Sequence, residues 1–447
     1  MLRIRWFDRE TESCPIEWPA AALIVATLFL NFVFWLGFAD RFWLLWPLPL
    51  FALVLIAVVI PITAAFFLLP ALAVHRAQRP LFPFLACSLG TVPASFMRLA
   101  GAVLLTLWLG SLVALPIWWS GGDYLPWRYT PARAVMLSTA LVLFLFATGS
   151  QSVRTEAKLA KFTIKLAAAI LIAAFLRVED GWPTILGGIR SVNSERGPVL
   201  SHACTELAFY VVPLALFAAD FGHRMASRRK VILSMTMGAA VPLIGTLLLV
   251  AMIDAATGAS SMYQPSLNPT VFMALWAHVR GSALPGRMMI VALTMFGAAR
   301  FGVRGLGIVA PDGRWKWIAL GGCGVGVILK SLHANADLSV TMMEFPARCL
   351  AAASAVVACD FLCKRTLPQI PKRVDWVACL AVLAGIALPA YYPLSPDLVT
   401  QVWSHPWTLR CYVVVLVLCL CGRGVEKLRG GREGRLVARD DGTIQAL

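Results

Sequence analysis

The chain has 447 residues, of which 59% are hydrophobic and only 14% are charged, and its mean hydropathy is +0.77. These values exclude a soluble globular domain, and apolar runs of about 18 to 25 residues predict membrane-spanning helices, not the short alternating strands of a β-barrel. The net charge of +16 does not indicate nucleic-acid binding, because the basic residues gather in short loops and at the two ends.

Twelve apolar segments follow one another along the chain and predict an all-α polytopic membrane protein. We expect the helices at Pro19 to Phe38, Pro47 to Val74, Phe84 to Ile117, Ala134 to Gly149, Phe162 to Leu176, Leu200 to Asp220, Val231 to Ala256, Met288 to Val303, Trp317 to Lys330, Val340 to Leu362, Val374 to Tyr391 and Trp407 to Leu420. Residues 1–18 precede them, the transmembrane domain covers 19–422, and the glycine-rich, charged segment 423–447 is expected to be disordered.

The third segment is unusually long for a single span. Gly90, Pro93 and Gly101 lie within it, and we expect them to break or tilt this helix.

Basic residues mark one side of the membrane. The connections after even-numbered spans hold Arg76 and Arg79; Arg154, Lys158 and Lys161; the run from Arg224 to Lys230; Arg304, Arg314 and Lys316; and Lys364, Arg365, Lys372 and Arg373. The other connections are poorer in positive charge. Because cytoplasmic loops carry the excess of lysine and arginine, both termini are predicted to lie in the cytoplasm, with the protein in the inner membrane.

The motifs of soluble enzymes are absent from the sequence: there is no Walker sequence, HExxH, GxSxG or GxGxxG after a strand. The eleven cysteines lie mostly in apolar segments, and their spacing does not predict a metal site. We therefore expect no enzyme activity and no cofactor.

Glu206 lies about six residues inside the sixth span, a turn or two before Pro213. A carboxylate at membrane depth must be paired, protonated or turned toward a cavity. A proline in mid-span removes a backbone hydrogen bond, which suits a discontinuous helix beside a binding cavity. Glu206 is thus a candidate for binding substrate or a coupling proton; the alternative is an ion pair with an arginine of a neighbouring helix.

Other polar and aromatic residues at membrane depth offer further candidates. Asn31 in the first span presents a donor and an acceptor that a heterocyclic substrate or another helix could use. Arg98 and Arg300 are expected to form interhelical ion pairs rather than contact a ligand. Trp108 and Tyr210 could stack on a planar substrate or pack in the core.

Several short motifs resemble the nucleobase cation symporter family of cytosine, uracil, allantoin and hydantoin permeases. The exit of the sixth span, Asp220 to Ala226, is similar to the family's Asp, aromatic, Ser, Arg, aromatic, Ala sequence with one residue inserted. Trp108 to Gly110 resembles the aromatic-Gly element of the third span, and Gly307 to Pro311 resembles the exit of the eighth. Cys359 to Arg365 and Val374 to Ala378 resemble the end of span ten and the start of span eleven.

The resemblance implies a LeuT-type fold. In that fold ten helices form two inverted five-helix repeats, here about 19–176 and 200–362, and two additional helices follow at about 374–422. It also implies that the first and sixth helices are broken around a midplane site. By position, Asn31, Trp108 and Tyr210 are similar to residues that hold a planar substrate in the family.

The eighth span departs from the family pattern. Between Ala292 and Arg300 only Thr294 offers a side-chain oxygen, whereas the family has hydroxyl residues that help to bind sodium. Thr294 remains a candidate substrate contact. A hard cation needs several oxygen ligands, so a proton carried by Glu206 is favoured over sodium as the coupling ion.

The sequence thus predicts a secondary active transporter of a small, planar nitrogenous solute such as a nucleobase, working by alternating access. Its expected partners are the solute and the lipid bilayer, and no nucleic acid. The alternative is a membrane sensor or scaffold that keeps the transporter fold without transport.

Overall fold

A computed structural model of the protein describes residues 15–30, 48–120, 153–175, 211, 214–248, 297, 299–310, 317–318, 320–322, 324, 336–363, 371–391 and 408–440. All regular secondary structure in these residues is helical, which confirms the predicted fold class. Within them, five helices are long and apolar enough to cross a membrane: Ala52–Ala77, Thr91–Gly110, Arg228–Leu248, Met343–Leu362 and Thr408–Glu426. Span four and most of spans six and nine lie outside the described residues, and so do parts of spans one, seven and eight.

The first span changes its helical form early. Helix α1 (Trp18–Ala26) has a proline in its first turn, where the missing N–H is tolerated, and it passes into the 3₁₀ turn η1 (Thr27–Leu30). The Thr27 hydroxyl donates to the Ile24 carbonyl at 2.7 Å. The regular α-helix therefore ends after nine residues, short of the twenty or so needed to cross a bilayer.

The second span is one continuous helix with a wider turn near its middle. It consists of α3 (Leu48–Thr63), the π-helical turn η3 (Ala64–Leu68) and α4 (Leu69–Ala77), and Pro61 lies inside α3 just before the π turn. The Tyr412 hydroxyl of the last span donates to the Ala65 carbonyl at 3.1 Å. A π turn loosens the regular hydrogen-bond ladder, and this side chain satisfies one carbonyl there.

Of the three residues expected to break or tilt the third segment, Gly90 breaks it, whereas Pro93 and Gly101 lie within the continuous helix that follows. The segment forms α5 (Leu81–Leu89) and α6 (Thr91–Ser120), and Gly90 has a positive φ of 102°. A Cβ at this position would lie 2.6 Å from the Cα of Val374, so only glycine fits. The amide of Thr91 donates to the Lys372 carbonyl at 3.0 Å, and that of Asp375 to the Leu89 carbonyl at 2.8 Å.

Helix α8 (Val153–Phe175) begins nine residues before the predicted fifth span. These additional turns carry four charged residues, so a hydropathy profile does not recognise them as part of an apolar span. Their placement is amphipathic: Val153, Glu156, Ala157 and Ala160 are buried, while Arg154, Lys158 and Lys161 are exposed. The hydrophobic stretch therefore underestimates the length of this helix at its N-terminal end.

The exit of the sixth span is held in place by one side-chain and one backbone hydrogen bond to other segments. It ends in the 3₁₀ turn η4 (Asp220–Arg224), which packs against α4. The Asp220 carboxylate accepts from the amide of Leu81 at 2.8 Å and so caps α5 from a distance, and the amide of Ile16 donates to the Arg224 carbonyl at 2.9 Å. A side chain at Gly222 would collide with the Ala71 carbonyl oxygen.

The seventh span also contains a π turn. It begins with α11 (Arg228–Met235), where Ser227 caps the helix by accepting from the Lys230 amide at 3.4 Å, and continues through η5 (Thr236–Ala240) to residue 248. A Cβ at Gly238 would lie 2.8 Å from the Ala22 carbonyl oxygen of α1. The small residue therefore allows the first and seventh spans to approach closely.

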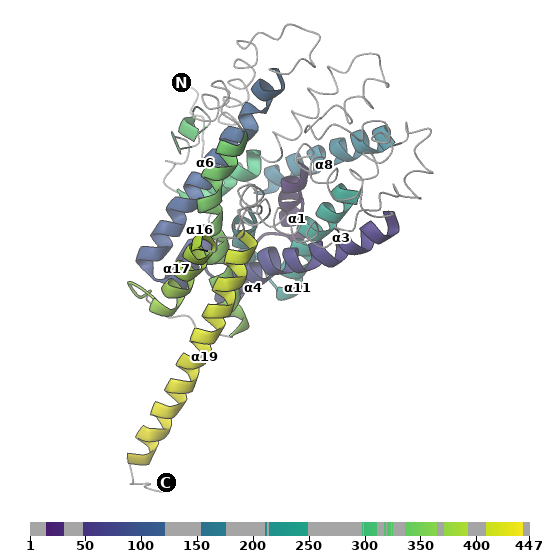
Figure 1. Ribbon diagram of the computed structural model, residues 1–447. Helices are drawn as coiled ribbons and strands as arrows, with labels where there is room; N and C mark the ends of the chain where they lie inside the picture. The colour runs from purple at the N-terminus through teal and green to yellow at the C-terminus, as the bar shows by residue number, and fades with distance from the viewer. Residues whose placement is uncertain are drawn as a thin grey trace, which may run out of the picture.

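The last three spans pack side by side (Figure 1). They are α16 (Ala336–Leu362), α17 (Trp376–Tyr391) and α19 (Thr408–Asp440). Residues Ala351 to Cys359 of α16 are all buried, and most are alanine, valine or cysteine, which permit close helix packing. Helix α6 packs along the other side of α16.

Helix α19 continues to Asp440, whereas the sequence predicted a disordered segment from residue 423. The difference has a physical reason. The costly nucleation of the helix is met inside the bundle, so each further residue adds a hydrogen bond at little extra cost. Figure 1 shows this yellow helix projecting from the rest of the molecule.

Candidate functional site

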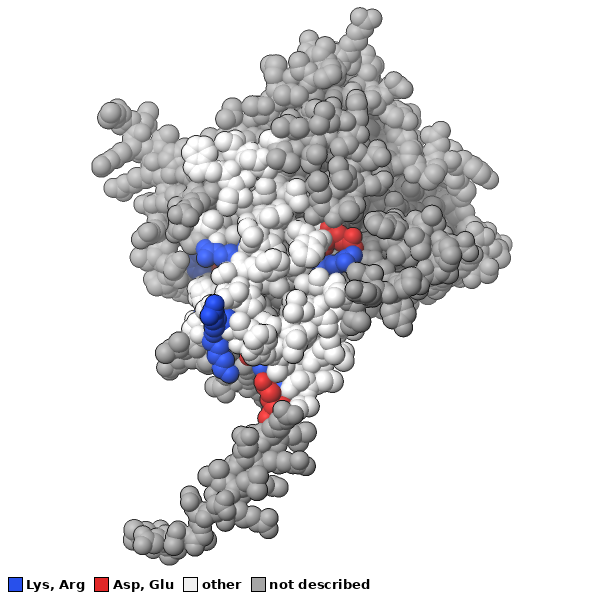
Figure 2. Space-filling view, turned by 60° about the vertical axis from the view of Figure 1, so that its left-hand side comes forward, with Lys and Arg blue, Asp and Glu red and all other residues white. Residues whose placement is uncertain are grey.

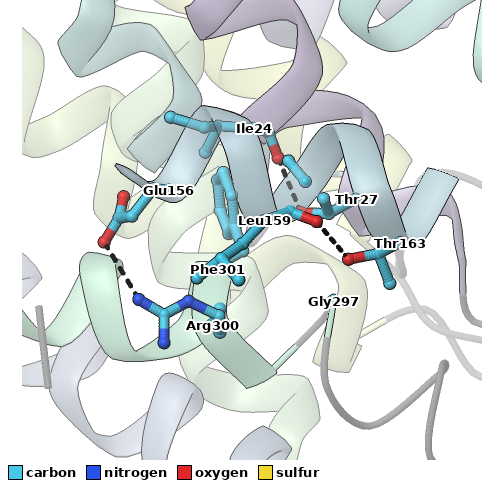
Figure 3. Close-up of a pocket in the computed structure, with 9 residues that line it drawn as sticks. Ile24, Thr27, Glu156, Leu159, Thr163, Gly297, Arg300 and Phe301 are labelled. Carbon is cyan, nitrogen blue, oxygen red and sulfur yellow. Dashed lines mark hydrogen bonds and ion pairs between the residues drawn. The ribbon is translucent and has the colours of Figure 1, made fainter. Parts of the chain in front are cut away.

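A small cavity lies where three helices meet (Figure 3). Its volume is about 20 Å³, which is sufficient for about one water molecule. The first span contributes Ile24 and Thr27, α8 contributes four residues, and the helical segment 299–309 with Gly297 just before it contributes the rest. The full lining is Ile24, Thr27, Glu156, Leu159, Ala160, Thr163, Gly297, Arg300 and Phe301.

Glu156 is the charged centre of this site. It is only 6% exposed, and its carboxylate lies 2.6 Å from Nη1 of Arg304 and 3.8 Å from Nη2 of Arg300. One carboxylate thus faces two guanidinium groups, leaving a formal charge of +1 in the cluster. The ion pair between Glu156 and Arg300 is visible at the left of Figure 3.

The position of Glu156 follows from the helical repeat of α8. Glu156, Ala160 and Thr163 are spaced four and three residues apart, which places them on one face of the helix. That face is buried against α1 and segment 299–309, whose Arg300 and Arg304 are likewise four residues apart. The helical spacing of α8 and the four-residue spacing of the two arginines therefore bring Glu156 together with Arg300 and Arg304.

The two threonine hydroxyls in the lining have already used their hydrogens. Thr27 donates to the Ile24 carbonyl at 2.7 Å and Thr163 to the Leu159 carbonyl at 2.6 Å. Each oxygen keeps acceptor capacity toward the cavity. The site therefore offers acceptors from two helices and donors from the guanidinium groups.

Arg304 extends the cluster to the sixth span. Its guanidinium carbon lies 4.6 Å from the centre of the Phe221 ring in η4, within the range of a cation–π contact. Through Arg304, segment 299–309 is connected both to α8 and to the exit of span six. The cluster consequently joins elements from both halves of the chain.

The charge and size of the cavity limit what it can hold. Two guanidinium groups oppose one carboxylate, so an additional bare cation would meet net repulsion. The volume admits a water molecule and not an organic solute. The arrangement suits a hydrated interhelical connection that can close or separate as the helices move.

Of the five residues predicted to bind the solute, only Trp108 lies within the described part. Asn31, Glu206, Tyr210 and Thr294 fall outside the described residues. Trp108 is half-buried on α6, and a Cβ at Gly302 would lie 2.9 Å from its ring. Trp108 therefore packs closely against the helix that also carries Arg300 and Arg304.

The two arginines expected to form interhelical ion pairs differ. Arg300 pairs with Glu156 across two helices, which confirms the prediction for that residue. Arg98 instead donates from Nε to the Val309 carbonyl, and its guanidinium lies 5.6 Å from the centre of the Phe82 ring. A backbone carbonyl at a helix end can satisfy a buried guanidinium without an acid.

Glu156 was not predicted as a site residue. The apolar window placed it in the loop before span five, where charges are usual. The sequence did contain an indication, because Glu156 is a single acid among Arg154, Lys158 and Lys161, and it lies on the opposite face of a helix drawn through them. The helical spacing of the charged residues, and not the hydropathy of the segment, would have identified Glu156 as a buried acid.

Comparisons with known proteins place this geometry in a fold. No protein-family model matches the sequence, and no curated protein matches it. Among solved structures, the chain is similar to Mhp1, a nucleobase-cation-symport-1 family transporter, in a closed conformation with bromovinylhydantoin bound. The TM-score is 0.61 at 16% identity, covering 94% of this chain and 96% of that one. An inward-facing conformation of Mhp1 gives the same TM-score.

Two other transporters resemble the chain over most of its length. A Na⁺-coupled sialic acid symporter aligns with a TM-score of 0.60 and 11% identity, covering 91% of this chain and 88% of that one. A manganese transporter of Eremococcus coleocola aligns with a TM-score of 0.53 and 14% identity, covering 91% and 94%. The chain has the fold of a LeuT-type membrane transporter, and its neighbours in structure are transporters, not enzymes.

Proposed function

We propose that the protein is a secondary active transporter that moves a small, planar nitrogenous solute by alternating access. The observation that carries the proposal is the likeness to Mhp1, which extends over 94% of this chain and 96% of the other. The cavity beside η1 adds to it, because a helix that loses its regular form next to buried charges is typical of transporter sites. Fold alone does not define a substrate, so the solute class rests on the motif resemblance.

In this proposal Asn31, Trp108, Tyr210 and Thr294 hold the solute and Glu206 carries a coupling proton. The charge around Glu156 supports a proton over sodium, since Arg300 and Arg304 disfavour a bare cation between α1, α8 and segment 299–309. A membrane potential of 100 mV supplies about 2.3 kcal/mol per co-transported charge, which is enough for an accumulation of tens-fold.

Purified protein in proteoliposomes tests the proposal. Thermal shift against nucleobases, hydantoins, amino acids and vitamins, with and without sodium, first identifies a solute, because a bound solute stabilises the folded state. Uptake driven by a proton gradient is then compared between the wild type and Glu206→Gln. The variant should lose accumulation and keep exchange. Glu426→Gln, at a half-exposed acid on α19, is the control and should accumulate normally.

A sensor or scaffold is the second candidate, and one observation favours it. The Glu156 cluster joins α8, segment 299–309 and η4 without offering a cation site, as expected of a protein that has lost ion coupling. A solute that raises the melting temperature of the wild type but is neither accumulated nor exchanged would favour this candidate. Proton-driven accumulation would exclude it.

We further propose that the basic connections and both termini face the cytoplasm of the inner membrane. Two exposed free cysteines, Cys363 after α16 and Cys421 on α19, lie on the predicted inner side. A membrane-impermeant maleimide should label them only after the cells are permeabilised. Labelling at these two positions in intact cells, lost in Cys363→Ser/Cys421→Ser, would reverse the orientation.

A further inference from the structure

The first half of α8 carries a one-sided row of positive charge. Arg154, Lys158, Lys161 and Lys165 are spaced four, three and four residues apart, and all four are exposed. At 100° per residue these positions fall within one narrow face of the helix. The row spans about 16 Å along the helix axis at 1.5 Å per residue.

Apolar surface accompanies the row. Phe162, beside Lys161, is 65% exposed, whereas the opposite face with Glu156, Ala160 and Thr163 is buried. Cations and an aromatic ring on one exposed face are typical of a helix at a lipid headgroup layer.

Acids within the described part of the chain do not neutralise this row. The nearby acid of α8, Glu156, is on the buried face and is engaged by Arg300 and Arg304. Six cations and one acid in this region leave a formal charge of +5. The partial positive charge of the α8 N-terminus adds to it, so an external anion should be attracted. On the face of the molecule shown in Figure 2, the described charged side chains form only small groups among uncharged residues.

We propose that this face of α8, formed by Arg154, Lys158, Lys161, Phe162 and Lys165, binds anionic phospholipid headgroups of the inner leaflet. The lysines can extend along the helix to reach phosphate groups while their stems cover apolar surface. Phe162 would lie among the upper acyl carbons. The ligand class is a lipid phosphate with net negative charge, such as phosphatidylglycerol, because a zwitterionic headgroup would cancel the attraction.

Lipid binding at this face does not depend on the transported solute, but it acts on the helix that carries Glu156. The lipid-binding face and Glu156 are on opposite sides of the same two turns of α8. A lipid that fixes the exposed side therefore also fixes the helix that carries the ion pair to Arg304.

The test compares two triple variants of the full chain. In one, Lys158, Lys161 and Lys165 are each changed to Gln; in the control, Arg228, Arg229 and Lys230, an exposed basic group at the start of α11, are changed to Gln. Each protein is placed in nanodiscs of phosphatidylcholine alone or with one third phosphatidylglycerol of the same acyl chains. The melting temperature and the phosphatidylglycerol retained in native mass spectrometry are measured.

The wild type and the α11 control should gain melting temperature and retain phosphatidylglycerol, and the α8 variant should lose at least half of both. All three should melt alike in phosphatidylcholine, since the changed residues are exposed. An α8 variant that keeps the full gain, or an α11 control that loses as much, would overturn the proposal. Equal stabilisation of the wild type by both lipids would also overturn it.

Discussion

Two buried arginine clusters lie among the helices, and they are built differently. In the first, Glu156 of α8 faces Arg300 and Arg304 beside a cavity that admits a water molecule. In the second, Arg423 of α19 faces Asp375 at 3.0 Å, Glu426 at 2.9 Å and Asp360 at 3.7 Å. The first has an excess of bases and the second an excess of acids.

Their surroundings differ as well. Asp360 and Asp375 have side chains only 2% and 6% exposed, and they lie in the tightly packed group of α16, α17 and α19. Asp375 also caps α17 by accepting from the Ala378 amide at 3.2 Å. Arg423 therefore fixes three helices to one another, whereas the Glu156 cluster lies beside a cavity with room for about one water molecule. We therefore expect the second cluster to be a fixed contact and the first, with space beside it, to be the one that can move.

The largest effect should come from Arg423→Met. This change leaves Asp360 and Asp375 buried without their guanidinium, and breaking a buried pair costs about 3–5 kcal/mol. We expect a large fall in melting temperature or loss of the monodisperse peak in size-exclusion chromatography. Glu426→Gln, which alters the half-exposed member of the same cluster, should change stability by less than about 1 kcal/mol. A stable Arg423→Met protein would mean that the second cluster is not a fixed contact.

A smaller loss of stability, with a change of conformation, should follow from Glu156→Gln. Arg300 and Arg304 would repel one another, but water from the cavity can hydrate them, so we expect about 1–3 kcal/mol. The distance between spectroscopic labels on α8 and on segment 299–309 should be longer in the variant than in the wild type. Glu156→Gln combined with Arg304→Gln should recover part of the stability. A variant with unchanged label distances would contradict the idea that this cluster moves.

Gly302→Ala should test the packing of segment 299–309 against α6 without changing the charges of Arg300 and Arg304. Its Cβ would lie 2.9 Å from the Trp108 ring and 3.0 Å from a Leu109 methyl group, and such overpacking costs about 1–3 kcal/mol. Gly307 has open space around it, so Gly307→Ala is the matched control and should be neutral or stabilising by up to about 1 kcal/mol. Melting temperatures of the two variants give the comparison. Equal effects would show that Trp108 has room to withdraw.

The smallest effect is expected from Tyr412→Phe. The variant loses only the hydrogen bond from the hydroxyl to the Ala65 carbonyl, while the edge contact with Phe66 at 4.4 Å remains. Such bonds in membrane proteins contribute about 0.6 kcal/mol on average. Hydrogen exchange at the amides of η3 should rise more than global stability falls. No local change in exchange would contradict a role for Tyr412 in holding the π turn.

The sequence predicted features that depend on local physics. Apolar length located α16 and α17 within a few residues. Gly90 was one of three residues expected to break or tilt the third segment, and the chain breaks there, where the backbone of Val374 leaves no room for a Cβ. The basic start of α8 and the helix beyond residue 423 were missed, because charged helical turns resemble loops to a hydropathy window. The pairing of Glu156 with Arg304 joins residues 148 positions apart, which spacing along the chain does not reveal.

The length of α19 has a mechanical consequence. From Glu426 to Asp440 the helix runs for fourteen residues, or about 21 Å, past the last residue of the apolar span. The projecting part is continuous with the part of α19 that packs against α16 and α17, so it turns together with these helices. A tilt of about 10° at its base would displace its far end by roughly 4 Å, following from the same rise per residue. A fluorophore at Asp440 would thus report motions that are too small to detect within the bundle.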